Sequence, residues 1–151
     1  MFKSLVAALG ALALFAATPA FADSPGVDDG VHRLALQISD DNPQKMNTVL
    51  NVAANVSRYY SEKGELVDIE IVAFNAGLHM LREDTSPVLD RLKSFSEGMP
   101  NVAFKACGNT LESMTKKEGK KPPIIAAAEV VPAGVIKLME LDQQGYTVVR
   151  P

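Results

Sequence analysis

The sequence predicts an α/β protein built on a mainly parallel β-sheet. Short segments rich in β-branched and apolar residues alternate with segments whose apolar residues recur at helical spacing, and the connections between them are short. Parallel neighbours need crossover helices, so this alternation favours a parallel sheet. A composition of 47% hydrophobic and 22% charged residues in 151 is that of an ordinary globular protein.

Residues 1–22 are interpreted as a signal peptide that is removed after Ala22. Lys3 supplies a positive charge, an uncharged stretch follows over residues 5–17, and Ala20 and Ala22 provide the small residues of a cleavage site. The stretch is short for a membrane span. We therefore expect a single mature domain over residues 23–151 in a bacterial periplasm, with no membrane contact after cleavage. An uncleaved membrane anchor is the alternative.

The first half of the domain is expected to form a strand, a helix and a second strand. Residues 32–39 alternate and end at a polar cluster, in which Asp40 and Asp41 are interpreted as turn and capping residues. Asn42 and Pro43 are typical of a helix start, and Gly64 is typical of a helix end. Residues 67–74 are apolar and β-branched, which predicts the second strand.

The second half is expected to continue the alternation. After a turn at residues 75–77 we expect a short helical turn over 78–81, a helix opened by Ser86 and Pro87, and a strand over 101–106. A helix then runs from residues 108–110 to about Lys117. Residues 124–131 are predicted as helix and then strand, residues 132–134 start the last helix, and residues 146–149 form a terminal strand.

Several functional classes are excluded by composition and motifs. The formal net charge of −3 gives no basic excess for a phosphate backbone, so we expect no nucleic-acid partner. One cysteine excludes an intramolecular disulfide and a CxxC pair. The chain has no P-loop, no GxGxxG, no GxSxG and no HExxH motif. We therefore expect no cofactor.

Polar and small residues follow two of the predicted strands where sites form in open parallel sheets, outside the carboxyl ends. Asn75, Gly77 and His79 follow the second strand. A second group follows the third strand and consists of Cys107, Gly108, Asn109 and Thr110. The sequence therefore predicts that the single cysteine and His79 share one edge of the sheet.

Two interpretations of Cys107 remain open. At a strand end before a helix, backbone N–H groups and the helix dipole favour a reactive thiolate. The alternative is a small buried hydrophobic residue, as most free cysteines are. His79 is interpreted either as a proton shuttle beside the thiol or as a surface or packing residue. Asn75 and Asn109 are interpreted as turn or cap residues, or as donors to an anion. His32 is expected to begin a strand and to carry no function.

Three segments together resemble the DsrE/DsrF-like superfamily of small sulfur-relay proteins. They are residues 75–79 (NAGLH), 104–111 (FKACGNTL) and 130–135 (VVPAGV), and the similarity runs over about residues 33–151. The resemblance implies a three-layer α/β/α fold with a five-stranded parallel sheet. It also implies assembly into oligomers, trimers or hexamers among them, and a carrier cysteine at the position of Cys107.

The resulting expectation is a periplasmic sulfur carrier that holds a persulfide on Cys107. Its partners would be a second copy of the chain and sulfur donors and acceptors, either proteins or small thiols. Asn75, Gly77, Gly108, Asn109 and Thr110 would form the binding pocket, with His79 beside the thiol. A non-catalytic binding or assembly module is the first alternative. A metal-handling protein that uses Cys107, His79 and Met80 or Met114 is the second, since soft sulfur and nitrogen ligands suit copper or zinc.

Overall fold

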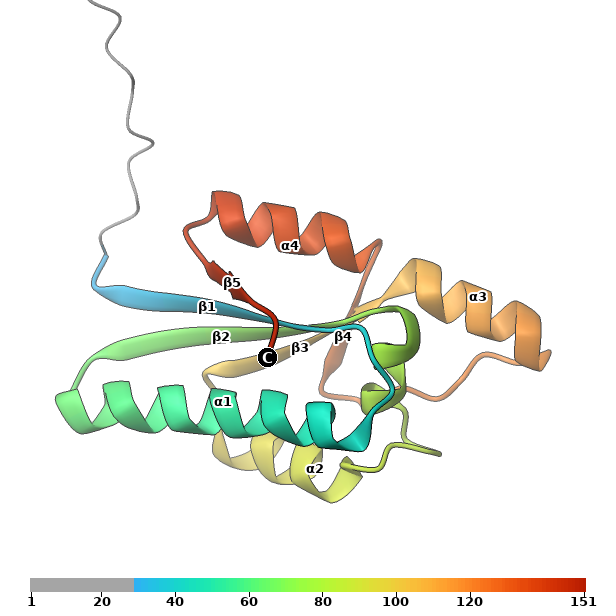
Figure 1. Cartoon of the computed structure of the whole chain (residues 1–151), viewed down its shortest axis with the longest axis horizontal. Coiled ribbons are helices and arrows are strands. Elements are labelled where there is room, and N and C mark those ends of the chain that lie inside the picture. Colours follow the sequence, from blue (N-terminus) through green and yellow to red (C-terminus); the bar gives the residue numbers. More distant parts are fainter. Residues whose placement is uncertain (1–28) are drawn as a thin grey trace, which may run out of the picture.

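A sheet of parallel strands forms the centre of the structure (Figure 1). The computed structural model describes residues 29–151, and in this part of the chain the sheet has five strands in the order β4-β3-β2-β1-β5. The strands are β1 (Val31–Ile38), β2 (Leu66–Ala73), β3 (Val102–Cys107), β4 (Ala128–Val131) and β5 (Thr147–Val149). Every neighbouring pair is parallel. The predicted signal peptide, residues 1–22, lies outside the described residues.

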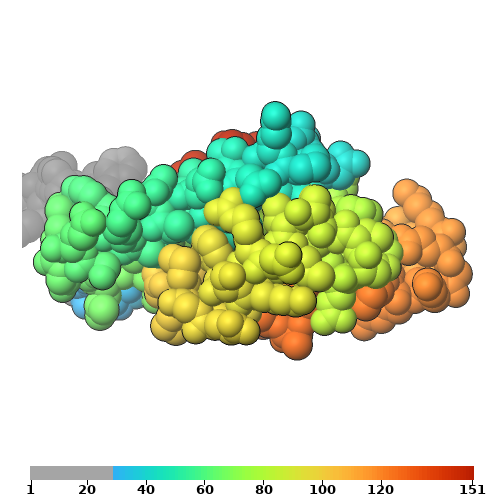
Figure 2. Space-filling model, turned by 90° about the horizontal axis from the view of Figure 1, so that it is seen from below, coloured from blue at the N-terminus to red at the C-terminus, as the bar shows by residue number. Residues whose placement is uncertain are grey.

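Helices cover both faces of the sheet, so the predicted three-layer α/β/α fold is confirmed. Helices α1 (Pro43–Lys63) and α2 (Leu89–Gly98) lie side by side on one face, as Figures 1 and 2 show. Helix α4 (Gly134–Gln143) covers the other face. The short 3₁₀ helix η1 (Asn75–Leu81) and helix α3 (Gly108–Glu118) lie at the carboxyl end of the strands. Among residues 29–151, none of the helices combines the length and the apolar character that a membrane span requires.

Helix α1 begins and ends where the sequence predicts. The Asn42 side chain accepts hydrogen bonds from the backbone N–H groups of Gln44 (2.8 Å) and Lys45 (3.4 Å), and Pro43 opens the first turn. Gly64 ends the helix at a φ of 71°, a left-handed conformation that glycine adopts without strain. Asp40, expected to be a turn or capping residue, forms ion pairs with Lys45 and Arg150.

The core is divided by the sheet into two unequal parts. The larger part lies under α1 and α2 and contains Ile69, Ile71 and Phe104. The smaller part lies under α4 and contains Ala35, Val72, Phe74, Cys107, Leu138 and Leu141. Successive residues of a strand point to opposite faces, so Phe104 and Cys107 lie on opposite faces of the same strand. The single cysteine is therefore packed beneath α4.

Two predicted elements differ from the structure. Helix α2 begins at Leu89, after the Ser86–Pro87 pair expected to open it. The segment before β4 is not helical, since Ile124 forms an isolated bridge with Arg82 and the Ile125 N–H donates to the Leu81 carbonyl at 3.0 Å. Long-range pairing with the end of η1 thus prevails over the local helical preference of the alanines.

Candidate functional site

A cavity of about 600 Å³ opens at the carboxyl end of the sheet, between η1, α3 and the start of α4. The predicted group of polar residues after β3 reaches it through Cys107, Asn109 and Thr110, and the group after β2 reaches it through Asn75. The residues that line it are Phe74, Asn75, Ala76, Cys107, Asn109, Thr110, Ser113, Met114, Lys117, Ala133, Gly134 and Val135. Lys117 is the only charged residue of this set.

Cys107 lies at the junction of β3 and α3. It is the last residue of the strand and the N-cap of the helix, with φ −68° and ψ 115°. Only 5% of its surface is exposed, yet it lines the cavity. Gly108 makes this junction possible, because a Cβ there would lie 3.0 Å from the Val131 carbonyl oxygen. Gly108 thus allows the start of α3 to pack against the end of β4, and it is not among the residues that line the cavity.

The first turn of α4 reaches the sulfur from the other side of the cavity. Gly134 is the first residue of α4, and a Cβ there would lie 2.9 Å from the Cβ of Phe74. The missing side chain lets the helix approach the β2 end closely enough for the Gly134 N–H to act on Cys107. Two helix N-termini, of α3 and α4, therefore converge on one thiol, and both favour negative charge there.

The pKa of the Cys107 thiol is lowered from its ordinary value. Burial alone would raise the pKa, because it disfavours the charged form. The Thr110 hydroxyl and the N–H groups of Gly134, Thr110 and Asn109 act in the opposite direction and outweigh burial. In the first turn of α3 no N–H forms a hydrogen bond of ordinary geometry with the sulfur. The Asn109 N–H donates to the Pro132 carbonyl at 3.2 Å, and its effect on the pKa of the thiol is the smallest of the four.

Asn75 contributes its backbone to the site. Its N–H donates to Thr110 Oγ1 at 3.0 Å, joining two segments 35 residues apart. Asn75 has a φ of 50°, which is uncommon outside glycine and better tolerated by asparagine than by most residues. The residue at the N-cap of η1 is Phe74, and no side chain caps this helix. The interpretation of Asn75 as a capping residue is therefore wrong.

His79 and Gly77 do not line the Cys107 cavity. His79 belongs to η1 but acts on Glu118, whose pKa is lowered mainly by Arg82 and to a smaller degree by His79. Gly77 is buried, and a Cβ there would collide with the carbonyl group of Ile38. Gly77 thus lets η1 pack against the end of β1. Both residues follow β2 within η1, yet neither is among the residues that line the cavity of Cys107.

The two methionines considered as metal ligands are separated by the fold. Met114 lines the cavity, whereas Met80 is fully buried in the larger core. Among residues 29–151, no group of three or more histidine, cysteine, aspartate or glutamate side chains is arranged to hold a metal ion.

Helical spacing could have revealed some of the lining residues that sequence reasoning missed. Ser113, Met114 and Lys117 follow Thr110 by three, four and seven positions, which places all four residues on one face of α3. Once Thr110 faces the site, the other three follow. By contrast, Phe74, Ala133 and Gly134 reach the cavity through the packing of α4 on the sheet, which no local pattern specifies.

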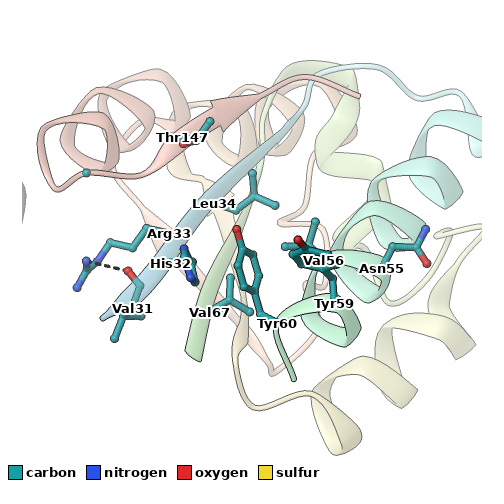
Figure 3. Close-up of a pocket in the computed structure, with 11 residues that line it drawn as sticks. Val31, His32, Arg33, Leu34, Asn55, Val56, Tyr59, Tyr60, Val67 and Thr147 are labelled. Carbon is teal, nitrogen blue, oxygen red and sulfur yellow. Dashed lines mark hydrogen bonds between the residues drawn. The ribbon is translucent and has the colours of Figure 1, made fainter. Parts of the chain in front are cut away.

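A second cavity, of about 620 Å³, lies at the amino end of the sheet (Figure 3). It is bounded by the starts of β1, β2 and β5 and by the last turns of α1, from which Tyr59 and Tyr60 project. His32 stacks on Tyr60 with ring centroids 3.9 Å apart, and its Nε2 lies 2.7 Å from Glu65 Oε2. Its imidazole is thus engaged by its neighbours, and the lining includes no nucleophilic thiol or carboxylate.

Comparison with known proteins supports the fold. No family model matches the chain, and no curated protein matches it. Among solved structures, the chain is similar to MTH1491 from Methanobacterium thermoautotrophicum, described as a protein of unknown function. The TM-score is 0.68 at 25% sequence identity, and the match covers 80% of this chain and 99% of that one. The three-layer architecture is therefore shared, and no activity comes with it.

Proposed function

We propose that the chain is a sulfur carrier of the DsrE/DsrF-like type, which accepts sulfur on Cys107 as a persulfide. One observation carries the proposal: a thiol with a lowered pKa lies in a cavity of about 600 Å³ at the carboxyl edge of a parallel sheet. The thiolate is the nucleophilic form of cysteine. The two converging helix N-termini favour that form.

The transfer needs no cofactor and no net oxidation. The Cys107 thiolate attacks the outer sulfur of a donor persulfide, R–S–SH. A bond forms between Cys107 Sγ and that sulfur, the S–S bond of the donor breaks, and the donor leaves as the thiolate RS⁻. An acceptor thiolate then attacks the outer sulfur of Cys107–S–SH and restores the Cys107 thiolate. One negative charge is present before and after each step.

Intact mass spectrometry of the native protein after incubation with inorganic polysulfide tests the proposal. We expect a mass gain of one sulfur atom that is removed by a small thiol such as dithiothreitol. Cys107→Ser, which keeps the size of the side chain but removes the sulfur nucleophile, should show no gain. The absence of a gain in the wild type, or the same gain in the wild type and in Cys107→Ser, would contradict the proposal.

A non-catalytic binding module is the second candidate, and the burial of Cys107 favours it. With 5% of its surface exposed, the residue could also serve as packing in the smaller core. Alkylation by iodoacetamide distinguishes the two functions. Modification in native buffer supports the carrier, whereas modification only after denaturant is added supports the binding module.

Export and self-assembly belong to the same proposal. The leader in residues 1–22 suggests a periplasmic protein. For assembly, the support is the outer side of α4, where Val135, Ile136 and Met139 are each more than half exposed. Light scattering should give a multiple of the monomer mass, and Ile136→Asp should lower it while Leu66→Asp, at an exposed apolar residue on β2, should not. A monomeric wild type would contradict this part.

A further inference from the structure

Thr110 contacts the backbone of Asn75 and lines the same cavity as Cys107. Thr110 is the third residue of α3, and its Oγ1 accepts the N–H of Asn75 at 3.0 Å. Asn75 follows β2 directly, Cys107 ends β3, and all three residues line the same cavity. The hydroxyl therefore connects the ends of two neighbouring strands at the point where the thiol opens to the cavity.

The contact with Asn75 determines what the hydroxyl can do. A threonine hydroxyl has one proton to donate and two lone pairs that accept. A backbone N–H can only donate, so Thr110 Oγ1 is the acceptor in this contact and its own proton is free for another partner. Two partners compete for that proton: the Cys107 sulfur, or a backbone carbonyl three or four residues earlier in the chain.

The backbone of Asn75 holds this arrangement in place. Its φ of 50° is a left-handed conformation that is uncommon outside glycine and that asparagine tolerates better than most residues. The N–H, unlike a side-chain donor, cannot rotate away or lose its proton. Its partner oxygen is thus fixed as an acceptor in every protonation state of the thiol.

We infer that Thr110 is a positioning residue that donates its hydroxyl proton to the Cys107 thiolate, held in that orientation by the Asn75 N–H. The inference deepens the proposed function and rests on it for its biological meaning. The hydroxyl of Thr110 is also the strongest of the groups that lower the pKa of the thiol against the effect of burial. Hydrogen bonds to reacting groups tighten as charge develops, so ionisation of Cys107 should shorten this contact.

Few charges compete with this effect at the sulfur. Lys117, from α3, is the only charged side chain that lines the cavity in the described part of the chain. The segments from β2, η1 and α4 contribute Phe74, Asn75, Ala76, Ala133, Gly134 and Val135, none of which titrates. A change in the titration of the thiol on substitution of Thr110 therefore reports on the hydroxyl.

The pH dependence of iodoacetamide alkylation in the full chain tests the inference. Thr110→Val keeps the shape of the side chain and removes the proton. We expect its alkylation midpoint to rise by about one pH unit, with about tenfold slower alkylation below the midpoint, as a hydrogen bond to a charged group warrants. Thr110→Ser should restore the wild-type midpoint. Thr115→Val, which removes an α3 hydroxyl that donates to the Leu111 carbonyl at 2.7 Å and does not line the cavity, should leave it unchanged.

The inference and the proposed function fail in different ways. A wild-type midpoint in Thr110→Val, with an unchanged circular dichroism spectrum, would overturn the inference and assign the proton to a backbone carbonyl. Thr110→Ala carries the same expectation should the valine variant fail to fold. A raised midpoint in a protein that never gains sulfur from polysulfide would uphold the role of Thr110 and reject the sulfur carrier.

Discussion

The two ends of the sheet have cavities of nearly equal volume and different linings. At the carboxyl end, about 600 Å³ lies between the starts of α3 and α4, where two helix N-termini favour an anion. At the amino end, about 620 Å³ lies beside the last turns of α1 and is lined by Tyr59, Tyr60, His32 and Arg33 among others. Of these two cavities only the one at the carboxyl end receives helix N-termini, so they differ in chemistry although they agree in size.

The largest effect is expected where the carboxyl end is packed most tightly. In Gly77→Ala the new methyl group would meet the backbone carbonyl of Ile38, so η1 or the end of β1 must move. We expect a loss of about 3 kcal/mol or more in the free energy of unfolding, measured by urea denaturation. Gly98→Ala, which has open space around the new methyl group, is the matched control. Equal stability of the two variants would mean that η1 is not fixed by this contact.

A smaller effect is expected at the start of α4. Gly134→Ala places a Cβ 2.9 Å from the Cβ of Phe74 and should displace the helix from the sulfur. We expect a loss of about 1–3 kcal/mol of stability, as for other overpacked sites. The alkylation midpoint of Cys107 should also rise, because the Gly134 N–H moves away. A destabilised variant with the wild-type midpoint would show that α4 packs the cavity without acting on the thiol.

Acid should weaken the carboxyl end selectively. The buried Arg82 pairs with Asp84 and Glu118 and lowers the pKa of Asp84 from 3.8 to about 2. A folded-state pKa below the unfolded value means that the pair stabilises the protein fully above about pH 4. This contribution is lost as the pH falls towards 2. In Asp84→Asn the stability should be lower at neutral pH and should converge with the wild type near pH 2.

Thermal denaturation at several pH values measures this convergence. Glu65→Gln, which breaks the exposed pair with His32 at the amino end, is the control and should change stability little at any pH. A difference between Asp84→Asn and wild type that persists undiminished at pH 2 would assign the loss of stability to packing.

The smallest effect is expected at the amino end. Tyr59 is 53% exposed, so Tyr59→Ala should change the free energy of unfolding by less than about 1 kcal/mol. The alkylation midpoint of Cys107 should stay at the wild-type value, because the two cavities lie at opposite ends of the strands. A shift of that midpoint in Tyr59→Ala would show that the two ends are coupled through the sheet.

The sequence predicts which residues lie at the carboxyl edge of the sheet better than it predicts which of them line the cavity. The alternation of elements and the caps at Asn42 and Gly64 give the fold, and the strand-end rule places Cys107 and Thr110 correctly. That rule fails to separate Asn75, which lines the cavity, from His79, which does not. Their directions depend on how η1 winds, and η1 is set by the contact of Gly77 with the end of β1.

The prediction of a helix at residues 124–127 fails for a related reason. Its alanines suggest a helix, but Ile124 bridges Arg82, the Ile125 N–H donates to the Leu81 carbonyl, and residues 126–127 form a turn. Both partners are more than 40 positions away in the chain. Gly134 is the same kind of case, since nothing in residues 130–135 alone indicates that the first N–H of α4 reaches a sulfur 27 residues earlier.

The lowered pKa of Cys107 depends on contacts between segments that lie far apart in the chain, and the contact between Asn75 and Thr110 is one of them. It joins backbone and hydroxyl across 35 residues, and a third group comes from α4 later still in the chain. An extended polypeptide holds none of these donors in place, so an unfolded chain has a thiol of ordinary pKa and reactivity. Only the folded tertiary structure lowers the pKa of the thiol, so the cysteine becomes reactive at the same step at which the domain folds.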